Sequence, residues 1–271
     1  LIKYGVQFGL FGGAVFQLGT AQHYRLYLEK LGKLELAGCF AMTETGHGSN
    51  VRDLETTATY DHATRSLTVY SPTQAAGKEY IGNALHSRMA AVFCQLVVNG
   101  QNHGIHTVLV PLRDENHQTL AGVTVKDNGY KMGLNGVDNG RIWFDNVRVP
   151  VENLLNRYGS IDENGQYQSP IQNPSKRFFT MLGALVGGRV SVALGSNTAA
   201  KKALDIAIRY AIKRRQFKTL SDEQETLLLD YPTHQERLFP LLAKSYALTF
   251  ALETLRRKFV ESAALDDKRE V

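Results

Sequence analysis

Residues 38–50 read GCFAMTETGHGSN, a short apolar run that passes into a loop with two glycines and several hydroxyl side chains. The apolar run predicts a buried strand. The loop can present backbone N–H groups to phosphate oxygens, because glycine permits close approach and unusual dihedral angles. A tight turn after a buried strand would produce the same pattern, and the spacing by itself favours that simpler interpretation.

The sequence after this loop has the pattern of short strands separated by turn residues. We expect strands at residues 55–60, 66–70, 90–98, 106–111, 123–126 and 141–144. Such a succession of short runs predicts an antiparallel β domain.

Helical patterns lie on both sides of this β domain. Residues 1–35 place apolar side chains near helical spacing, with Thr20 as a plausible N-cap. Residues 197–214 carry small apolar side chains at the spacing of a closely packed helix. A second helix is expected around residues 233–258, with Pro240 bending or interrupting it.

The order of these patterns predicts an α+β fold in three parts. Residues 1–35 would end an N-terminal helical domain, residues 36–157 would form the middle β domain, and residues 158–271 would begin a C-terminal helical domain. The polar stretch at 156–175, rich in Gly, Asn and Pro, marks the linker. Because the chain does not begin with Met and closes on a charged tail at Val271, we expect it to be part of a longer protein.

The composition is typical of a soluble, globular protein, with 43% hydrophobic and 21% charged residues. A formal net charge of +5 suits an anionic ligand such as a nucleotide without requiring a polyanionic partner.

No apolar stretch approaches the roughly 20 residues of a membrane-spanning helix, and no signal-peptide pattern opens the chain, so we expect an intracellular protein. Cys39 and Cys94 lack metal-ligand spacing, which favours buried thiols over a disulfide framework or a zinc site.

Motifs further along the chain join residues 38–50 in one family pattern. They are 54–60 (LETTATY), 138–140 (DNG), 145–150 (DNVRVP), 152–155 (ENLL), 209–211 (RYA) and 214–217 (RRQF). In this order they resemble the acyl-CoA dehydrogenase and oxidase superfamily, in which a Thr-Glu pair precedes a glycine loop. The resemblance covers essentially the whole chain and implies the family fold, a central antiparallel β-barrel-like domain flanked by helical domains.

Within the superfamily the pattern is similar to the acyl-CoA oxidase branch. His47 and Asn50 stand where dehydrogenases usually show a small residue and an Asp. In residues 78–84 (KEYIGNA), Tyr80 and Gly82 replace a Trp and a hydroxyl residue. A missing side chain at Gly82 would open room for oxygen beside a flavin, although Gly-Asn is also common turn chemistry.

The resemblance implies FAD as the cofactor. The residues implied to contact it are Met42, Thr43, Gly48, Ser49, Tyr80 and Gly82. Backbone N–H groups near Met42 and the Thr43 hydroxyl would stabilise negative charge on the reduced ring, and Ser49 would approach the pyrophosphate. Both hydroxyls could instead be ordinary strand-end groups bonded to their own backbone.

Arg214, Gln216 and Phe217 are implied to reach the FAD of the neighbouring subunit in a homodimer. A guanidinium suits a pyrophosphate because it forms a permanently charged, bidentate fork. Basic residues near a helix C-terminus are also favoured by the helix dipole, and this explanation suffices for Lys213 and Arg215.

Asn139 and Arg189 are the implied substrate-binding residues. Arg189 would lie near the active site or CoA, and Asn139 in a turn near the substrate entrance. A type I′ hairpin turn would explain residues 138–140 equally well. We expect His47 to be structural or close to a ligand, and Glu44 to be structural, so neither is taken as the catalytic base.

The implied activity is FAD-dependent α,β-dehydrogenation of acyl-CoA thioesters to trans-2-enoyl-CoA, in fatty acid β-oxidation. Oxygen would be the acceptor and hydrogen peroxide the second product. A carboxylate would take the α-proton while the β-hydrogen leaves as hydride. In the family that carboxylate lies far downstream, so we expect it beyond Val271, name no catalytic residue and expect this chain alone to be inactive.

Two alternatives remain open. One is an acyl-CoA dehydrogenase served by an electron-transfer flavoprotein, which oxygen reactivity would distinguish. The other is a non-catalytic, flavin-bearing relative that binds nucleic acid through the basic residues of 201–215. That segment lacks interleaved aromatic residues and a continuous basic face, so we expect no nucleic-acid partner. We also expect no membrane partner, because no apolar stretch approaches the length of a spanning helix. We expect the protein to lie in the cytoplasm if its source is bacterial and in the peroxisome if its source is eukaryotic. The bacterial cytoplasm is slightly favoured.

Overall fold

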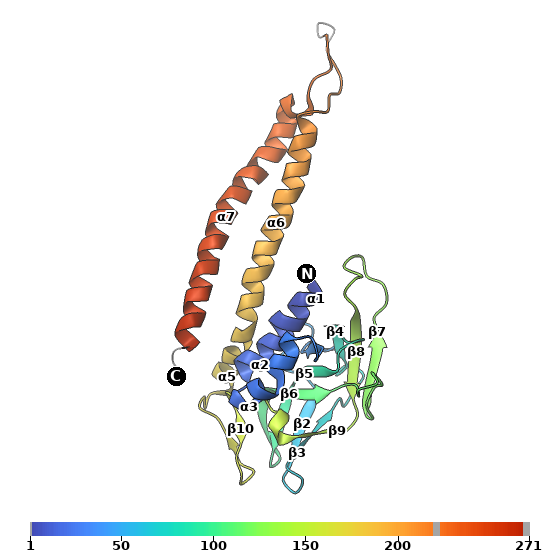
Figure 1. The fold of residues 1–271 in the computed structure, drawn as a ribbon, viewed down its shortest axis with the longest axis vertical. Coiled ribbons are helices and arrows are strands. Elements are labelled where there is room, and N and C mark those ends of the chain that lie inside the picture. The colour runs from blue at the N-terminus through green and yellow to red at the C-terminus, as the bar shows by residue number, and fades with distance from the viewer. Residues whose placement is uncertain (1, 219–222, 268–271) are drawn as a thin grey trace. The chain divides into compact units, whose positions relative to one another are not determined.

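The structure is a computed structural model that describes residues 2–218 and 223–267. The chain forms two compact units, 1–185 and 186–271. The first unit contains helices packed on β-sheets, and the second contains two long helices (Figure 1). The three-part division expected from the sequence stays a prediction.

The first unit is built on a six-stranded sheet in the order β1-β5-β2-β3-β9, with β6 paired to β5. Its strands are β1 (Gly38–Ala41), β2 (Thr57–Asp61), β3 (Ser66–Tyr70), β5 (Met89–Val98), β6 (Gln101–Pro111) and β9 (Val147–Pro150). Because β6 occupies one edge of β5 along its length, β1 and β2 share the other edge. β1 pairs with residues 89–92 and β2 with residues 95–97, both parallel to β5.

A second, three-stranded sheet has the order β4-β8-β7. Its strands are β4 (Lys78–Gly82), β7 (Val123–Asp127) and β8 (Asn139–Phe144). The α+β class is confirmed, and most strand pairs are antiparallel as expected, whereas β1–β5 and β2–β5 are parallel. They are parallel because the loop of residues 42–56 returns the chain, so that β2 continues along the edge of β5 in the direction of β1.

Both faces of the larger sheet are buried, and β5 explains why. Successive side chains of a strand point to opposite faces, so Val92 and Cys94 pack in one core cluster while Phe93 packs in the other. A strand buried on both faces has a continuous apolar sequence instead of an alternating one. Residues 89–98 read MAAVFCQLVV and follow this rule.

N-terminal helical segments cover one face of the larger sheet (Figure 1). They are α1 (Ile2–Tyr4), the π-helical η1 (Gly5–Gly12), α2 (Gly13–Leu18), α3 (Ala21–His23), the π-helical η2 (Tyr24–Leu28) and α4 (Glu29–Gly32). Thr20 is the N-cap of α3, as predicted. Gly38 allows η1 to approach β1, because a Cβ at this position would lie 2.0 Å from the buried ring of Phe11.

The first unit closes with short elements after β9. They are the 3-10 helix η3 (Val151–Asn153), β10 (Ser160–Ile161), β11 (Tyr167–Gln168), α5 (Pro174–Leu182) and the 3-10 helix η4 (Gly183–Leu185). The predicted loop at 156–175 therefore contains a small antiparallel pair. Asn173 caps α5 by accepting a hydrogen bond from Lys176 N at 3.0 Å.

The second unit consists of α6 (Val186–Ala211), the 3-10 helix η5 (Leu228–Asp230) and α7 (Pro232–Asp267). The two long helices contact each other, and Asn197 Nδ2 donates to Thr249 Oγ1 at 3.0 Å between them (Figure 1). The helix predicted at 197–214 is confirmed up to Ala211 and begins earlier than expected. The helix predicted at 233–258 is confirmed and is longer than expected.

Three further expectations, on Pro240, on residues 138–140 and on the two cysteines, have different outcomes. Pro240 does not interrupt the second long helix, because α7 continues through this residue, and the expected bend stays a prediction. The turn expected at 138–140 is wrong, because β8 begins at Asn139. Cys39 and Cys94 are free and buried as predicted, and burial raises the pKa of each thiol to about 12.

One helical run corrects the expectation about membrane-spanning length. Residues 174–211 are long and apolar enough to cross a membrane, with a mean hydropathy of 1.5 in the relevant window. This criterion uses length and composition only, and core helices of soluble proteins satisfy it as well.

A buried polar cluster joins β6 to the segment after β9. His106 Nδ1 lies 3.0 Å from Gly104 O, and its Nε2 lies 2.9 Å from the Tyr167 hydroxyl. Burial lowers the pKa of His106 to about 4, so the neutral ring donates to Gly104 and accepts from Tyr167. Arg177 donates to the carbonyl of His103 at 2.6 Å in the same cluster.

This cluster makes stability depend on pH. Below pH 6.5 the unfolded chain protonates His106, whereas the folded chain does so only near pH 4. The free energy of unfolding should therefore fall by about 3 kcal/mol from this residue as the pH drops through that window. Urea titrations should show a shallower pH dependence in His106→Gln than in the wild type, and equal slopes would contradict the account.

Candidate functional site

A small pocket opens where β1 ends, beside β4 and the first helical segments. It has a volume of about 180 Å³. Four of the predicted site residues line it, namely Met42, Thr43, Tyr80 and Gly82. Phe40 and Leu10 add apolar surface to the same wall. Residues from two distant segments of the sequence thus meet at one site, as the resemblance implied.

An irregularity in β4 positions Tyr80 and Gly82 at the pocket. The pairing of β4 with β8 shifts register between Lys78 and Ile81, and Tyr80 has a φ of +57° at this bulge. Bulges redirect side chains, and that of Tyr80 is 68% exposed. A Cβ on Gly82 would lie 3.0 Å from Val6 Cγ2, so the glycine allows the first helical segment to approach β4 closely at the pocket wall.

Asn139 supports this bulge from the neighbouring strand. Its Nδ2 donates to Tyr80 O at 2.7 Å, and its Oδ1 accepts a hydrogen bond from Lys131 Nζ. The amide of Asn139 is therefore already engaged within the chain. Its predicted role in substrate binding stays a prediction.

Thr43 presents hydrogen-bonding groups to the pocket. Its carbonyl accepts from Glu79 N at 2.9 Å, which ties it to β4. Within residues 2–218 and 223–267, neither the Thr43 amide nor its hydroxyl has a hydrogen-bond partner. These two groups are the donors that a ligand in the pocket could use.

Glu79 is a buried carboxylate that holds the rim of the pocket together. It accepts hydrogen bonds from Thr45 Oγ1 at 2.8 Å, Asn128 Nδ2 at 2.6 Å and Arg141 Nε at 2.7 Å. Burial alone would raise the pKa of Glu79, but these three donors hold that pKa below its ordinary value. The residue therefore stays ionised and joins the loop after β1 to the residue that follows β7 and to β8.

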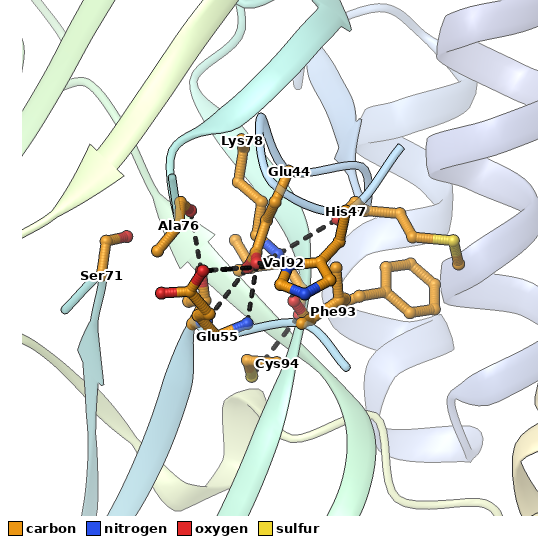
Figure 2. Close-up of polar contacts among 12 residues, drawn as sticks. Glu44, His47, Glu55, Ser71, Ala76, Lys78, Val92, Phe93 and Cys94 are labelled. Carbon is orange, nitrogen blue, oxygen red and sulfur yellow. Dashed lines mark hydrogen bonds and ion pairs between the residues drawn. The ribbon is translucent and has the colours of Figure 1, made fainter. Parts of the chain in front are cut away.

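Behind the pocket wall lies a buried ion pair between Glu44 and Lys78, whose Oε1 and Nζ are 3.0 Å apart (Figure 2). Glu44 also accepts from Glu55 N at 2.7 Å, and from Thr56 N at 3.0 Å and Oγ1 at 2.6 Å. Burial would raise the pKa of Glu44, but the Lys78 ammonium and the Thr56 donors hold that pKa below its usual range. A carboxylate saturated in this way agrees with the structural role expected for Glu44.

His47 lies at the edge of the same cluster (Figure 2). Its Nδ1 is 3.5 Å from Glu44 Oε2 and 3.9 Å from Glu55 Oε1, and it has no hydrogen-bond partner among the described residues. Gly48 and Ser49 follow in an exposed loop and do not line the pocket. Their predicted contact with a pyrophosphate stays a prediction.

The other predicted site residues belong to the second unit. Arg214, Gln216 and Phe217 are exposed, and Gln216 N and Phe217 O bond Thr226 at 3.0 and 2.8 Å. Arg189 lies near the start of α6, about 33 Å along the helix from its end at a rise of 1.5 Å per residue. Within one chain, Arg189 and the 214–217 segment are therefore too far apart to contact the same part of a ligand.

Sequence reasoning missed Lys78 and Glu79 as site residues. Their signal was present, because a Lys-Glu pair beside the apolar Tyr80 and Ile81 is unusual for a strand that packs in a core. Charged residues are almost never fully buried unless they are paired. A search for partners of these two charges would have indicated Glu44 and Arg141.

Comparison with known proteins places this geometry in a family context. Residues 39–147 match the model of the acyl-CoA dehydrogenase middle domain, and residues 182–270 match that of the acyl-CoA oxidase C-alpha1 domain. The chain is 46% identical over 261 residues to peroxisomal acyl-coenzyme A oxidase 3 of Arabidopsis thaliana, covering 96% of this chain and 39% of the relative. It thus spans about two fifths of the length of the curated relatives that it matches.

Solved structures give the same result. The acyl-CoA oxidase 1 of Yarrowia lipolytica superimposes with a TM-score of 0.91 at 39% identity, over 97% of this chain and 38% of that one. The acyl-CoA oxidase-2 of Caenorhabditis elegans, described as bound with FAD, ascaroside-CoA and ATP, gives a TM-score of 0.89 at 35% identity, over 95% and 38%.

The Glu79 contacts can be tested by one substitution. Glu79→Gln replaces an acceptor by an amide that cannot accept from all three donors, and unsatisfied buried polar groups cost about 1–3 kcal/mol each. The denaturation midpoint should fall accordingly. Glu253→Gln, which removes an exposed partner of Arg256 on α7, is the control and should leave the midpoint unchanged. An equal response of both variants would contradict the role of Glu79.

Proposed function

Because the chain belongs to the acyl-CoA oxidase and acyl-CoA dehydrogenase superfamily, we propose that it is the flavin-binding part of an acyl-CoA oxidase. The observation that carries this proposal is the 46% identity to an acyl-CoA oxidase across 96% of the chain. The reaction is the α,β-dehydrogenation of an acyl-CoA to a trans-2-enoyl-CoA, with oxygen reduced to hydrogen peroxide. This activity belongs to the oxidation of fatty acids.

The pocket residues fit one wall of an FAD site. A flat heterocycle needs apolar surface against its face and donors at its oxygen-bearing rim. Phe40 and Met42 supply apolar surface, and Thr43 supplies an amide and a hydroxyl without partners among the described residues. FAD, when bound, supplies the acceptor for the hydride that leaves the β-carbon.

The remaining predicted residues have proposed roles at this cofactor or at the substrate. Thr43 would stabilise negative charge at the ring, and Ser49 with Gly48 would approach the pyrophosphate. Arg214, with Gln216 and Phe217, would reach the FAD of the partner subunit in a homodimer. Asn139 and Arg189 would contact the acyl-CoA.

No catalytic base is assigned to the pocket wall. Glu44 is saturated by Lys78, Thr56 and the Glu55 amide, and Glu79 accepts from three side chains. A base must reach the proton that it abstracts, and neither carboxylate has an oxygen left without donors.

The relatives also bear on the compartment. Three Arabidopsis oxidases similar to the chain carry "peroxisomal" in their names. The lean toward a bacterial cytoplasmic protein has no support among them. We therefore propose the peroxisome as the compartment of this protein.

The proposal is tested with the full-length protein, mixed in air with a long-chain acyl-CoA. We expect it to carry FAD, whose visible absorption bleaches, and to form peroxide at the rate of enoyl-CoA formation. Bleaching that persists in air until an electron acceptor is added would move the assignment to a dehydrogenase. Protein that purifies without FAD and binds none would contradict the flavin site itself.

Gly82 provides a test of oxygen access. In Gly82→Ala the new methyl group would lie 3.0 Å from Val6 Cγ2 and narrow the pocket. We expect reoxidation of the reduced protein by oxygen to slow about tenfold, a barrier increase of about 1.4 kcal/mol, while reduction by substrate changes less. Gly133→Ala, whose methyl group would meet nothing within 4 Å, is the control. Unchanged reoxidation in Gly82→Ala would exclude this route for oxygen.

A further inference from the structure

The shared edge of β5 leaves a gap that the backbone does not fill. β1 ends its pairing at Val92, and β2 begins its pairing at Gln95. Phe93 O lies in the interval between them. Its partner is the ammonium of Lys78, whose Nζ donates to this carbonyl at 2.6 Å. A side chain from β4 thus completes the hydrogen bonding of β5 where two strands meet.

The same ammonium holds the backbone just after β1. Lys78 Nζ donates to Glu44 Oε1 at 3.0 Å (Figure 2). It also donates to Met42 O at 3.1 Å. A lysine ammonium has three donors, and all three are satisfied by Met42, Glu44 and Phe93. Lys78 is fully buried, so bulk water does not reach the ammonium. The ammonium can therefore adopt only the position that these three acceptors define.

Glu44 fixes the other side of the gap. Its carboxylate accepts from the amides of Glu55 and Thr56, the two residues that precede β2. The pair Glu44–Lys78 therefore connects the end of β1, the start of β2 and the first residue of β4. Removing either charge would be strongly unfavourable, because the other would be left buried without its counter-charge.

The position of Met42 O determines where the next amide points. The chain contains no cis peptide bond among the described residues, and in a trans peptide the C=O and the following N–H point in opposite directions. Met42 O points into the core toward Lys78, so Thr43 N–H points away from it. Thr43 lines the pocket, and its amide has no partner among the described residues.

We propose that Lys78, held by Glu44, is a positioning residue that turns the Met42–Thr43 peptide so that the Thr43 amide faces the flavin pocket. This inference rests on the proposed function, because the ligand that would use the amide is the FAD ring. Lys78 does not touch the ligand and acts through the peptide. A preoriented donor needs no reorganisation when the ligand binds.

A merely structural ion pair would affect stability alone, so the test compares stability with flavin binding. Lys78→Met keeps the length of the side chain but removes the ammonium. Arg177→Met is the matched control, because Arg177 is another buried cation that donates to two carbonyls, of Ile171 at 3.0 Å and His103 at 2.6 Å. It lies in the cluster around His106 and does not line the pocket.

The measurements use full-length protein stripped of FAD, below the unfolding midpoint of each variant. Both variants should unfold at lower temperature than the wild type. Only Lys78→Met should raise the dissociation constant for FAD by at least about tenfold, or about 1.4 kcal/mol, and shift the visible absorption band of the bound flavin.

The inference would be overturned if Lys78→Met bound FAD as tightly as Arg177→Met and the visible absorption band of the bound flavin did not shift. Wild-type protein without affinity for FAD would instead contradict the proposed function, and the inference with it. If Lys78→Met gives no folded protein, Glu44→Gln replaces it, because this variant removes the counter-charge that holds the ammonium. A dissociation constant within about twofold of the wild type in Glu44→Gln would then overturn the inference.

Discussion

Along one edge of β5, two parallel strands share the positions that a single strand could occupy, and a buried lysine completes the bonding between them. An unpaired carbonyl in a core costs about as much as a lost hydrogen bond, so the gap has to be filled. Lys78 fills it at Phe93, and Glu44 supplies the charge that allows an ammonium to be buried there. The junction of β1, β2 and β4 depends on this interaction.

The pocket follows from that junction. Met42 and Thr43 lie on its outer side, between the ammonium behind them and the open space in front. Glu79, the residue after Lys78, holds the rim by accepting from Thr45 and two residues of the second sheet region. Consecutive residues of β4 therefore serve the inner and the outer side of one wall, and the bulge at Tyr80 continues that wall toward Gly82.

The sequence predicted the parts of this structure that depend on local patterns. Runs such as 66–70 and 90–98 are strands because their apolar spacing is that of buried β-structure, and the glycine loop after residue 41 ends a strand as expected. Family motifs brought Met42, Thr43, Tyr80 and Gly82 to one pocket. The direction of strand pairing could not be predicted, because the sequence pattern of a strand is the same whether its neighbour is parallel or antiparallel. The burial of Lys78 could not be predicted either, because its partners come from residues 42, 44 and 93.

The most direct test is a crystal structure of the full-length protein with FAD. The account predicts an acceptor atom of the flavin ring within about 2.7–3.2 Å of Thr43 N, with Lys78 Nζ still bonded to Met42 O behind it. A ring bound away from residues 42–43, or a Thr43 amide turned toward the core, would contradict the account.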